Sequence, residues 1–394
     1  MPVPGLDIPL PDAPGAPLDW AHLVARFAWL QSLAGVPQDP VFHAEGDVWV
    51  HTRMVCEALS DNARWRALPD TERTTVMAAA LFHDIAKPAT TRCEDDGRVT
   101  ARGHSRRGEL MARGELWRMG VPFEVREAVA AMVRYHQHPF FLLGREDAAR
   151  DALTLSMAAR CDHLALLAES DMRGRVCPDQ SRVLDAIDLF RDYCDELGCL
   201  ARPRAFANDL SRYEYFHTLG RDPDYAAWDD GGFEVVLMAG LPGAGKSRWI
   251  RAHRPDWPVV SLDAMRVAMG RTMDDDQGAI VQAAEARARE HLRARRPFVW
   301  DATNLTRQRR AALVSLFAAY GARVRIVYVE APEAVLRAAN AARPEAERVP
   351  ARVIDSLVQR WEVPDLTEAH TLEIALRDED GGYRTPDMFQ VATP

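Results

Sequence analysis

Two hydrophobic patterns divide the chain of 394 residues. From Trp20 to about Leu200, apolar residues recur every three or four positions, and runs of alternating β-branched residues are missing. This spacing predicts helices that each bury one face. Val48, His51 and Val55 share one such face, so a histidine is expected to point toward the core. Residues 1–18 are rich in proline and glycine and predict a loose arm.

A different pattern begins near residue 232. Short continuous apolar runs alternate there with helical stretches, as in a parallel sheet covered by helices. The runs cover residues 234–238, 259–263, 297–301 and 323–330. Ligands of such sheets gather at the carboxyl ends of the strands. We therefore predict an α + α/β protein, with an all-helical domain at 19–200, a bridge at 201–231 and an α/β domain at 232–394.

The most specific motif follows the first of these strands. Residues 240–247 read G-x-x-x-x-G-K-S, the P-loop pattern, between an apolar strand and a helix-compatible segment. Glycines suit this turn because side chains would keep backbone N–H groups away from phosphate oxygens. Lys246 is expected to reach the β- and γ-phosphates of ATP or another nucleoside triphosphate, and Ser247 to bind Mg²⁺. The other predicted nucleotide-binding residues of the loop are Gly240, Pro242, Gly243, Ala244 and Gly245.

Composition and charge exclude several classes of protein. The net charge of −9, with its acidic excess in the first 231 residues, argues mildly against a nucleic-acid coat protein. No apolar run reaches the length of a membrane span, and the N-terminus lacks the features of a signal peptide. The six cysteines contain no C-x-x-C pair, so neither a zinc ribbon nor a disulfide framework is indicated. We expect a reduced, cytoplasmic protein with no membrane partner.

The use of lysine adds one candidate. Only Lys87 and Lys246 are lysines among the 49 basic residues, so arginine is used almost everywhere else. Lys246 lies in the P-loop, where a compact ammonium is preferred to a planar guanidinium. By the same reasoning Lys87, which closely follows His83 and Asp84, is a candidate catalytic residue.

Potential metal ligands are concentrated in the helical half. His83 shares a helical face with Val76 and Ala80, Asp84 follows it directly, and Pro88 is expected to end this helix. Further histidines stand at His51, His104, His136 and His138. One histidine on an apolar face is usually a core residue, but several together with a carboxylate suit one or two divalent transition metal ions. Such ions lower the pKa of bound water and hold a phosphoryl group.

The order of His51, then His83-Asp84, then a later aspartate resembles the HD phosphohydrolase superfamily. The wording is similar to the HD domains attached to CCA-adding enzymes in Val50-His-Thr52, Leu81-Phe-His-Asp-Ile-Ala-Lys-Pro88, Gly103-His104 and Ser170-Asp-Met-Arg-Gly-Arg175. The resemblance covers about residues 20–200. It implies that His51, His83, Asp84 and a final aspartate bind a metal such as Mn²⁺, Ni²⁺ or Co²⁺, and that His104 and His136 hold a second ion.

The final aspartate has two candidates. Asp171 resembles the form in the CCA-attached domains, while Asp162 resembles an alanine–aspartate–arginine form found in other HD proteins. Helical residues rotate by about 100° each, so the two aspartates point to opposite faces. Asp171 lies on the apolar stripe and is favoured; Asp162 stays the alternative.

Polar residues after the later strands suggest phosphoryl transfer. Asp263 and Arg266 follow the second apolar run, and Asp301 ends the third, with Asn304 just after it; acidic and amide groups there can order the Mg²⁺ shell or the acceptor. A carboxylate can accept the proton of an attacking hydroxyl, and an arginine can hold a neighbouring phosphate. Arg337 and Arg343 belong to an arginine-bearing helical stretch, where a guanidinium would stabilise charge on the transferring phosphoryl group.

These residues resemble the kinase domain of polynucleotide 5′-kinases over about residues 233–370. The matching text is the P-loop, Ser261-x-Asp-x-x-Arg266, Asp301-x-Thr-Asn304 and Asn340-x-x-Arg343. The match implies that Asp263 is the general base, that Arg266 holds the 3′-side phosphate of the acceptor and that Arg343 contacts the donor phosphates. Phage and animal members add a phosphatase domain with its own sequence motif. Residues 374–382 of this chain resemble that motif only superficially, so we expect a terminal hairpin there.

The order of the two domains resembles bacterial HD–polynucleotide kinase fusions of RNA repair. This implies phosphorylation of 5′-OH ends of RNA, or of DNA, and removal of a 2′,3′-cyclic phosphate, 2′-phosphate or 3′-phosphate at the other end. A separate ligase would then seal the ends. Two alternatives stay open: an HD nucleotidase fused to a small-molecule kinase, and a nucleotide-sensing regulator with an inactive HD site.

Overall fold

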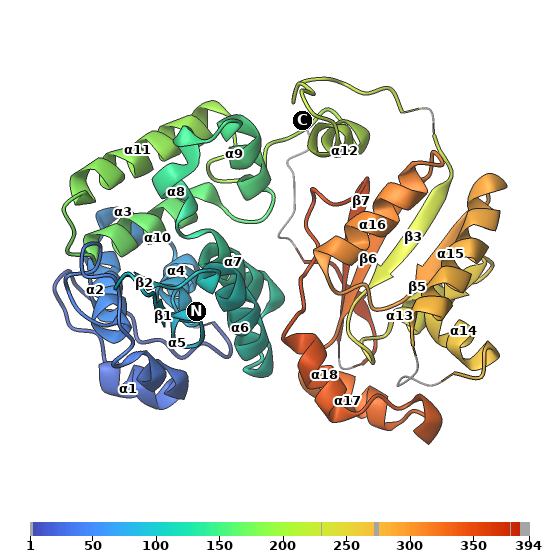
Figure 1. The fold of residues 1–394 in the computed structure, drawn as a ribbon, viewed down its shortest axis with the longest axis horizontal. Helices are drawn as coiled ribbons and strands as arrows, with labels where there is room; N and C mark the ends of the chain where they lie inside the picture. Colours follow the sequence, from blue (N-terminus) through green and yellow to red (C-terminus); the bar gives the residue numbers. More distant parts are fainter. Residues whose placement is uncertain (1–2, 230, 272–275, 379, 387–394) are drawn as a thin grey trace. The chain divides into compact units, whose positions relative to one another are not determined.

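The computed structural model describes residues 3–229, 231–271, 276–378 and 380–386 (Figure 1). The chain divides into two compact units, one ending at Arg204 and the other beginning at Ala205. Figure 1 shows the first as a group of helices and the second as a sheet with helices on its faces. The predicted fold class is therefore confirmed.

The first unit is built almost entirely from helices. Its helices are α1 (Trp20–Arg26), η1 (Ala28–Leu33), α2 (Val48–Asp61), α3 (Ala63–Arg66), α4 (Asp70–Phe82), α5 (Lys87–Thr90), α6 (His104–Arg118), α7 (Phe123–Tyr135), α8 (His138–Phe141), η2 (Leu142–Gly144), α9 (Ala148–Ser156), α10 (Cys161–Arg173) and α11 (Gln180–Glu196). The two-residue strands β1 (Arg92–Cys93) and β2 (Val99–Thr100) form an antiparallel hairpin. Helices α2, α4, α7 and α10 pack against one another and bury their apolar faces.

The ends of α2 and α4 position two parts of the site. Asp47 caps α2 by accepting a hydrogen bond from the Val50 N–H at 2.9 Å. The cap fixes the start of the helix, and His51 lies buried in its first turn. Helix α4 ends at Phe82, earlier than the expected end at Pro88. Pro88 instead lies in the first turn of α5. Backbone N–H groups in the first turn have no partner within the helix, so the N–H that proline lacks is not needed there.

The N-terminal segment differs from the expected loose arm. Residues 3–18 contain no helix or strand, but Val3, Leu6, Ile8 and Leu18 are buried. Burial of four apolar side chains holds an irregular segment against its unit. The composition predicted the irregular backbone and missed the packing; residues 1–2 of the arm lie outside the described residues.

The second unit contains a six-stranded sheet in the order β4-β5-β3-β6-β7-β8. Its strands are β3 (Glu234–Ala239), β4 (Val259–Ser261), β5 (Phe298–Asp301), β6 (Arg323–Glu330), β7 (Thr371–Arg377) and β8 (Tyr383–Arg384). Its helices are α12 (Asp209–His217), α13 (Lys246–His253), α14 (Leu262–Ala268), α15 (Gly278–Arg293), α16 (Arg307–Ala318), α17 (Glu333–Ala341), η3 (Glu345–Glu347) and α18 (Ala351–Val358). The first five strands in this order, β4, β5, β3, β6 and β7, pair in parallel with their neighbours. Strand β8 is antiparallel to β7. The β7–β8 pair is the hairpin expected near the C-terminus.

Part of the predicted bridge belongs to the second unit. Helix α12 groups with it, and the Arg212 guanidinium donates hydrogen bonds to the carbonyl oxygens of Leu366 at 3.0 Å and His370 at 2.7 Å. The ring of Tyr213 stacks on that of His370 at 3.6 Å. These contacts pack Arg212 and Tyr213 of the bridge inside the second unit; Asp230 lies outside the described residues. Among the described residues, no helix is long and apolar enough to cross a membrane.

Candidate functional sites

Six predicted metal ligands meet in the first unit and form a cluster, here called the histidine–aspartate cluster. Each stands at or near the end of a helix, and the helices converge. The residues are His51 in α2, His83 and Asp84 after α4, His104 at the start of α6, His136 after α7 and Asp171 near the end of α10. All six side chains are buried.

One half of the cluster contains His51, His83 and Asp171. The Nε2 atom of His51 lies 3.1 Å from Asp171 Oδ1 and 3.3 Å from His83 Nε2. The other half contains His104 and His136, whose Nε2 atoms are 3.5 Å apart. Asp84 is the third member of the second half. Within each half, the three donor atoms lie within 4.8 Å of one another.

Asp84 connects the two halves. Its Oδ2 lies 3.1 Å from His83 Nε2 and its Oδ1 lies 3.5 Å from His104 Nε2. Burial alone would raise the pKa of Asp84, but the charges of His83 and Lys87 outweigh burial and hold the pKa well below its ordinary value. The carboxylate is therefore ionised and can face both halves of the cluster.

Backbone carbonyl oxygens orient three of the histidines. The Nδ1 atoms of His83, His104 and His136 lie 2.8, 2.8 and 2.9 Å from the carbonyl oxygen three residues earlier in the chain. A carbonyl only accepts, so Nδ1 carries a proton, and in the neutral form that binds a metal the Nε2 lone pair of each ring points into the cluster. Such outer hydrogen bonds are typical of histidines that bind metals.

A carboxylate orients the fourth histidine. Glu45 Oε1 lies 2.9 Å from His51 Nδ1 and 2.8 Å from His43 Nδ1. Burial opposes ionisation of Glu45, but the hydrogen bonds from His43 and His51 outweigh it and lower its pKa. The sequence analysis missed this residue, because nothing in the spacing of Glu45 and His51 indicates the contact.

The donor set fits one or two divalent transition metal ions. Imidazole nitrogens that share a metal at about 2.1 Å lie roughly 3.0–3.4 Å apart, close to the 3.3 and 3.5 Å between the two pairs of Nε2 atoms. Burial and the neighbouring His83 lower the pKa of His136 to about 3, so its ring is neutral and available as a ligand. Among the described residues, Asp84 Oδ1 accepts no hydrogen bond, while Oδ2 is held by ion pairs with His83 and Lys87. Mixed imidazole and carboxylate donors suit such ions.

The two candidates for the final aspartate lie at opposite ends of α10. Asp171 is in the cluster, and Arg175 binds it through two contacts of 2.9 and 2.7 Å. Asp162 lies in the first turn of α10, where its carboxylate pairs with Arg160 at 2.6 Å. The geometry favours Asp171, as the apolar stripe did.

A cavity of about 460 Å³ opens beside the cluster. Its lining includes His43, Lys87, His104, Arg175, Arg182, Phe42, Phe140 and Phe141. The Nζ atom of Lys87 lies 2.7 Å from Asp84 Oδ2 and donates to Gln38 Oε1 at 2.6 Å. Cationic groups and aromatic rings therefore line the cavity beside the cluster.

The second site is built around the P-loop between β3 and α13. A Cβ atom on Gly240 would lie 2.1 Å from the Val329 carbonyl oxygen, and one on Gly243 would lie 2.8 Å from that of Leu336. Both residues also have positive φ, at 137° and 86°. Only glycine meets both constraints, so the loop can lie close to the carbonyl oxygens of Val329 in β6 and Leu336 in α17.

The predicted kinase residues share one cavity of about 330 Å³. Its lining includes Pro242, Gly243, Gly245, Lys246, Ser247, Asp263, Arg266, Asp301 and Arg343. Gly240 and Ala244 complete the loop from buried positions outside the lining. The Nζ of Lys246 donates to the carbonyl oxygens of Gly240 and Leu241 at 2.9 and 3.0 Å.

Charge in this cavity is unevenly distributed. The exposed Asp263 carboxylate lies 2.5 Å from Arg266 Nη1. Burial raises the pKa of Asp301, and the negative charge of Asp263 adds to the effect against the opposing charge of Lys246. Burial lowers the pKa of Lys246, while Asp301 and Asp263 oppose the change. The Lys246 ammonium thus lies near enough to Asp301 and Asp263 for their negative charges to act on it.

Some residues near this cavity differ from the sequence-based expectation. The amide of Asn304 donates to the Met238 carbonyl oxygen at 2.7 Å, so it holds β3; the residue is buried and is not part of the cavity lining. Arg337 pairs with Asp355 at 2.7 Å and connects α17 to α18. Conversely, three arginines that the motifs did not single out line the cavity: Arg248, Arg251 and Arg377.

Comparisons with known proteins support the division into two domains. Residues 47–167 match the family model of the HD domain, and residues 235–364 match that of an AAA domain. A multifunctional CCA protein of Stenotrophomonas maltophilia (strain K279a) is 34% identical over 156 residues, which are 37% of this chain and 35% of that protein. One of Xanthomonas campestris pv. campestris (strain B100) is 30% identical over 196 residues, 48% of this chain and 44% of that protein.

A further relative of the same name, from Cupriavidus metallidurans, is 33% identical over 184 residues, 43% of this chain and 40% of that protein. The chain spans less than half the length of each of these relatives. The two matched families agree with the helical first unit and with the sheet and P-loop of the second unit. The chain therefore carries a helical HD domain followed by a P-loop domain of the AAA type.

Proposed function

We propose that this protein is a bifunctional enzyme that repairs the ends of broken RNA. The P-loop domain transfers the γ-phosphoryl group of a nucleoside triphosphate to a 5′-hydroxyl end. The HD domain hydrolyses a 2′,3′-cyclic phosphate or a 2′-phosphate at the other end. The observation that supports the kinase activity best is the placement of Asp263 and Arg266 in the same cavity as Lys246 and Ser247.

In the kinase reaction, Asp263 accepts the proton of the attacking 5′-hydroxyl. The oxygen then forms a bond to the γ-phosphorus, and the bond to the β-phosphate oxygen breaks to release a nucleoside diphosphate. Lys246 and Arg343 balance the negative charge on the phosphates, and Arg266 holds the phosphate next to the acceptor. Mg²⁺ at Ser247 would neutralise charge on the β- and γ-oxygens. The exposed carboxylate of Asp263 is open to the acceptor.

In the phosphohydrolase reaction, the cationic groups at the cavity bind the terminal phosphate. Lys87 and Arg175 both line the cavity and lie within ion-pair distance of the cluster carboxylates. Transition metal ions in the cluster would lower the pKa of a water molecule and polarise the phosphoryl group. The aromatic rings of Phe42 and Phe141, which are 50% and 58% exposed, offer surfaces on which a nucleobase can stack.

A polynucleotide is the favoured substrate for two reasons. The relatives are named CCA proteins, which supports nucleic acid as the substrate here. In addition, five arginines line the kinase cavity: Arg248, Arg251, Arg266, Arg343 and Arg377. This exceeds the need of one triphosphate and suits several acceptor phosphates. Binding of RNA should therefore weaken steeply as salt increases.

The test is a transfer assay with γ-labelled ATP and a panel of acceptors. The panel contains an RNA and a DNA oligonucleotide with 5′-OH ends, the same oligonucleotides already phosphorylated, nucleosides and simple sugars. We expect label on the 5′-OH oligonucleotides alone, with less transfer at high salt. Transfer to nucleosides or sugars with unlabelled oligonucleotides would overturn the proposal in favour of a small-molecule kinase.

A further inference from the structure

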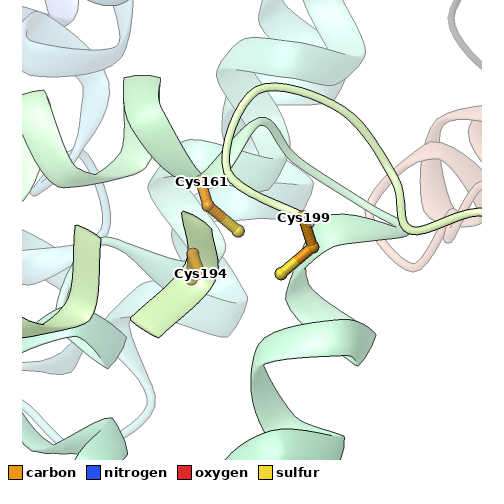
Figure 2. A group of neighbouring side chains, drawn as sticks. All are labelled: Cys161, Cys194 and Cys199. Carbon is orange, nitrogen blue, oxygen red and sulfur yellow. The ribbon is translucent and has the colours of Figure 1, made fainter. Parts of the chain in front are cut away.

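Three cysteines that are distant in the sequence meet inside the first unit. The Sγ atoms of Cys161, Cys194 and Cys199 all lie within 4.8 Å of one another, and the three side chains are buried. Figure 2 shows the side chains of Cys161 and Cys199 pointing toward the same space beside Cys194. The sequence contains no C-x-x-C pair, so the spacing gave no sign of this group, here called the cysteine cluster.

The backbone holds the three residues together independently of any ligand. Cys161 is the first residue of α10, and Cys194 lies in the last turns of α11. The Cys199 N–H donates to the Cys194 carbonyl oxygen at 2.8 Å, which folds the chain back onto α11. The Asp162 N–H donates to the Leu200 carbonyl oxygen at 2.9 Å, which fixes the start of α10 beside this turn. The sulfurs are therefore preorganised.

The three buried sulfurs form one set of donor atoms. Cysteine binds a metal ion as the thiolate, so an ion that binds all three sulfurs releases their protons.

We propose that Cys161, Cys194 and Cys199 form a site for one thiophilic metal ion, Zn²⁺ or Cu⁺. Thiolates are the soft ligands that select these ions. A Zn–S bond of about 2.3 Å puts tetrahedral ligands about 3.8 Å apart, so sulfurs within 4.8 Å need only small side-chain rotations. A disulfide would need two sulfurs at about 2.05 Å and would leave the third thiol unpaired.

The cysteine cluster is separate from the histidine–aspartate cluster. Cys161 begins α10 and Asp171 lies ten residues later, which corresponds to about 15 Å along a helix. An ion at the cysteine cluster is therefore structural: it fixes one end of the helix whose other end carries Asp171. The inference does not depend on the substrate of either domain, so it can fail while the proposed function holds, and the reverse.

Cobalt provides the most specific test. The reduced full-length protein is titrated with Co²⁺, and the thiolate-to-cobalt charge-transfer absorption in the near ultraviolet is followed. Histidine and aspartate ligands do not give this band, so ions in the other cluster stay silent. We expect the band to reach the intensity of one thiolate-bound cobalt per protein once both clusters are supplied, to be lost in Cys194→Ser, and to persist in His83→Ala and in Cys56→Ser, a buried cysteine outside the cluster.

A second measurement needs no variant and covers a failure of Cys194→Ser to fold. The native protein is alkylated with and without Zn²⁺, and the modified cysteines are mapped by mass spectrometry. Zn²⁺ should protect Cys161, Cys194 and Cys199 but leave the exposed Cys93 reactive. A Cu⁺-selective chelator under anaerobic conditions then tells which ion the purified protein holds.

Three results would overturn the proposal. The first is the absence of a charge-transfer band in the wild-type protein. The second is an equally strong band in a folded Cys194→Ser variant. The third is a disulfide between two of the three cysteines, or alkylation that Zn²⁺ does not change. Each would identify the cluster as core packing of three thiols.

Discussion

The two candidate sites achieve their geometry in different ways. The histidine–aspartate cluster uses buried side chains from the ends of several helices, from His51 to Asp171. The P-loop site uses the backbone of one short loop and side chains that are open to its cavity. In the first, the four histidines and Asp171 are held by outer hydrogen bonds, and loss of one ligand affects the shared ions. In the second, binding and chemistry belong to different residues and can be separated by mutation.

The largest expected effect is on the chemical step of the kinase. Asp263→Asn keeps the size of the side chain but removes the proton acceptor, so kcat should fall by about 10²–10⁴-fold. ATP binding should change little, because the P-loop is untouched. Asp256→Asn, at an exposed aspartate in the same unit, is the control. An equal loss of ATP affinity and kcat would contradict the separation of binding from chemistry.

In the HD domain the corresponding change should affect binding and chemistry together. Asp84→Asn replaces the carboxylate that faces both halves of the cluster, so metal content and phosphohydrolase activity should both fall. The loss should exceed the roughly 100-fold that removal of an outer hydrogen-bond partner of a metal ligand can cause. Elemental analysis and hydrolysis of a cyclic-phosphate end measure the two. Normal metal content with lost activity would contradict the assignment of Asp84 as a shared ligand.

An outer residue of the same cluster should have a smaller effect. Glu45→Gln weakens the hydrogen bond to His51, and metal affinity should fall by about 10–100-fold. Excess metal should restore activity, because the ligands remain. Glu57→Gln on the outer face of α2 is the matched control. Failure of excess metal to rescue Glu45→Gln would show a role other than orientation of the ligand.

Gly243→Ala tests the backbone of the P-loop. A Cβ atom would lie 2.8 Å from the Leu336 carbonyl oxygen at a residue with φ of 86°, so we expect a loss of about 1–3 kcal/mol in the stability of the second unit. Gly270→Ala, which also has positive φ but no atom within 4 Å, isolates the steric part. Thermal unfolding measures both, and equal losses would contradict a steric cause.

The smallest expected effect is a pH dependence of the second unit. Burial lowers the pKa of His370 to about 3, and its Nδ1 accepts the Val324 N–H at 3.1 Å. The unfolded chain binds the proton more readily, so this contribution is complete above about pH 6.5 and falls by up to about 1.4 kcal/mol per unit toward pH 3. His370→Gln should flatten the dependence, as measured by denaturant unfolding. An unchanged slope would assign it to other groups.

Local sequence patterns predicted more of the P-loop site than of the HD site. The loop lies within one stretch of residues, and its chemistry depends on glycines that the motif states directly. The ligands of the histidine–aspartate cluster were found because they resemble a known order of residues. Glu45, Arg175 and the cysteine cluster were missed, because their contacts depend on how helices pack. Asn304 was misjudged, because the strand-end position does not tell whether its amide faces the cavity or β3.

The most direct test of two independent sites for the repair of RNA ends uses one RNA with a 5′-OH and a 2′,3′-cyclic phosphate. It is incubated with γ-labelled ATP and Mg²⁺, and then with added Mn²⁺, Ni²⁺ or Co²⁺, for the wild type, Lys246→Ala and Asp84→Ala. The account predicts that Lys246→Ala loses only the 5′ label and that Asp84→Ala loses only the opening of the cyclic phosphate. ATP turnover with both RNA ends unchanged would contradict it.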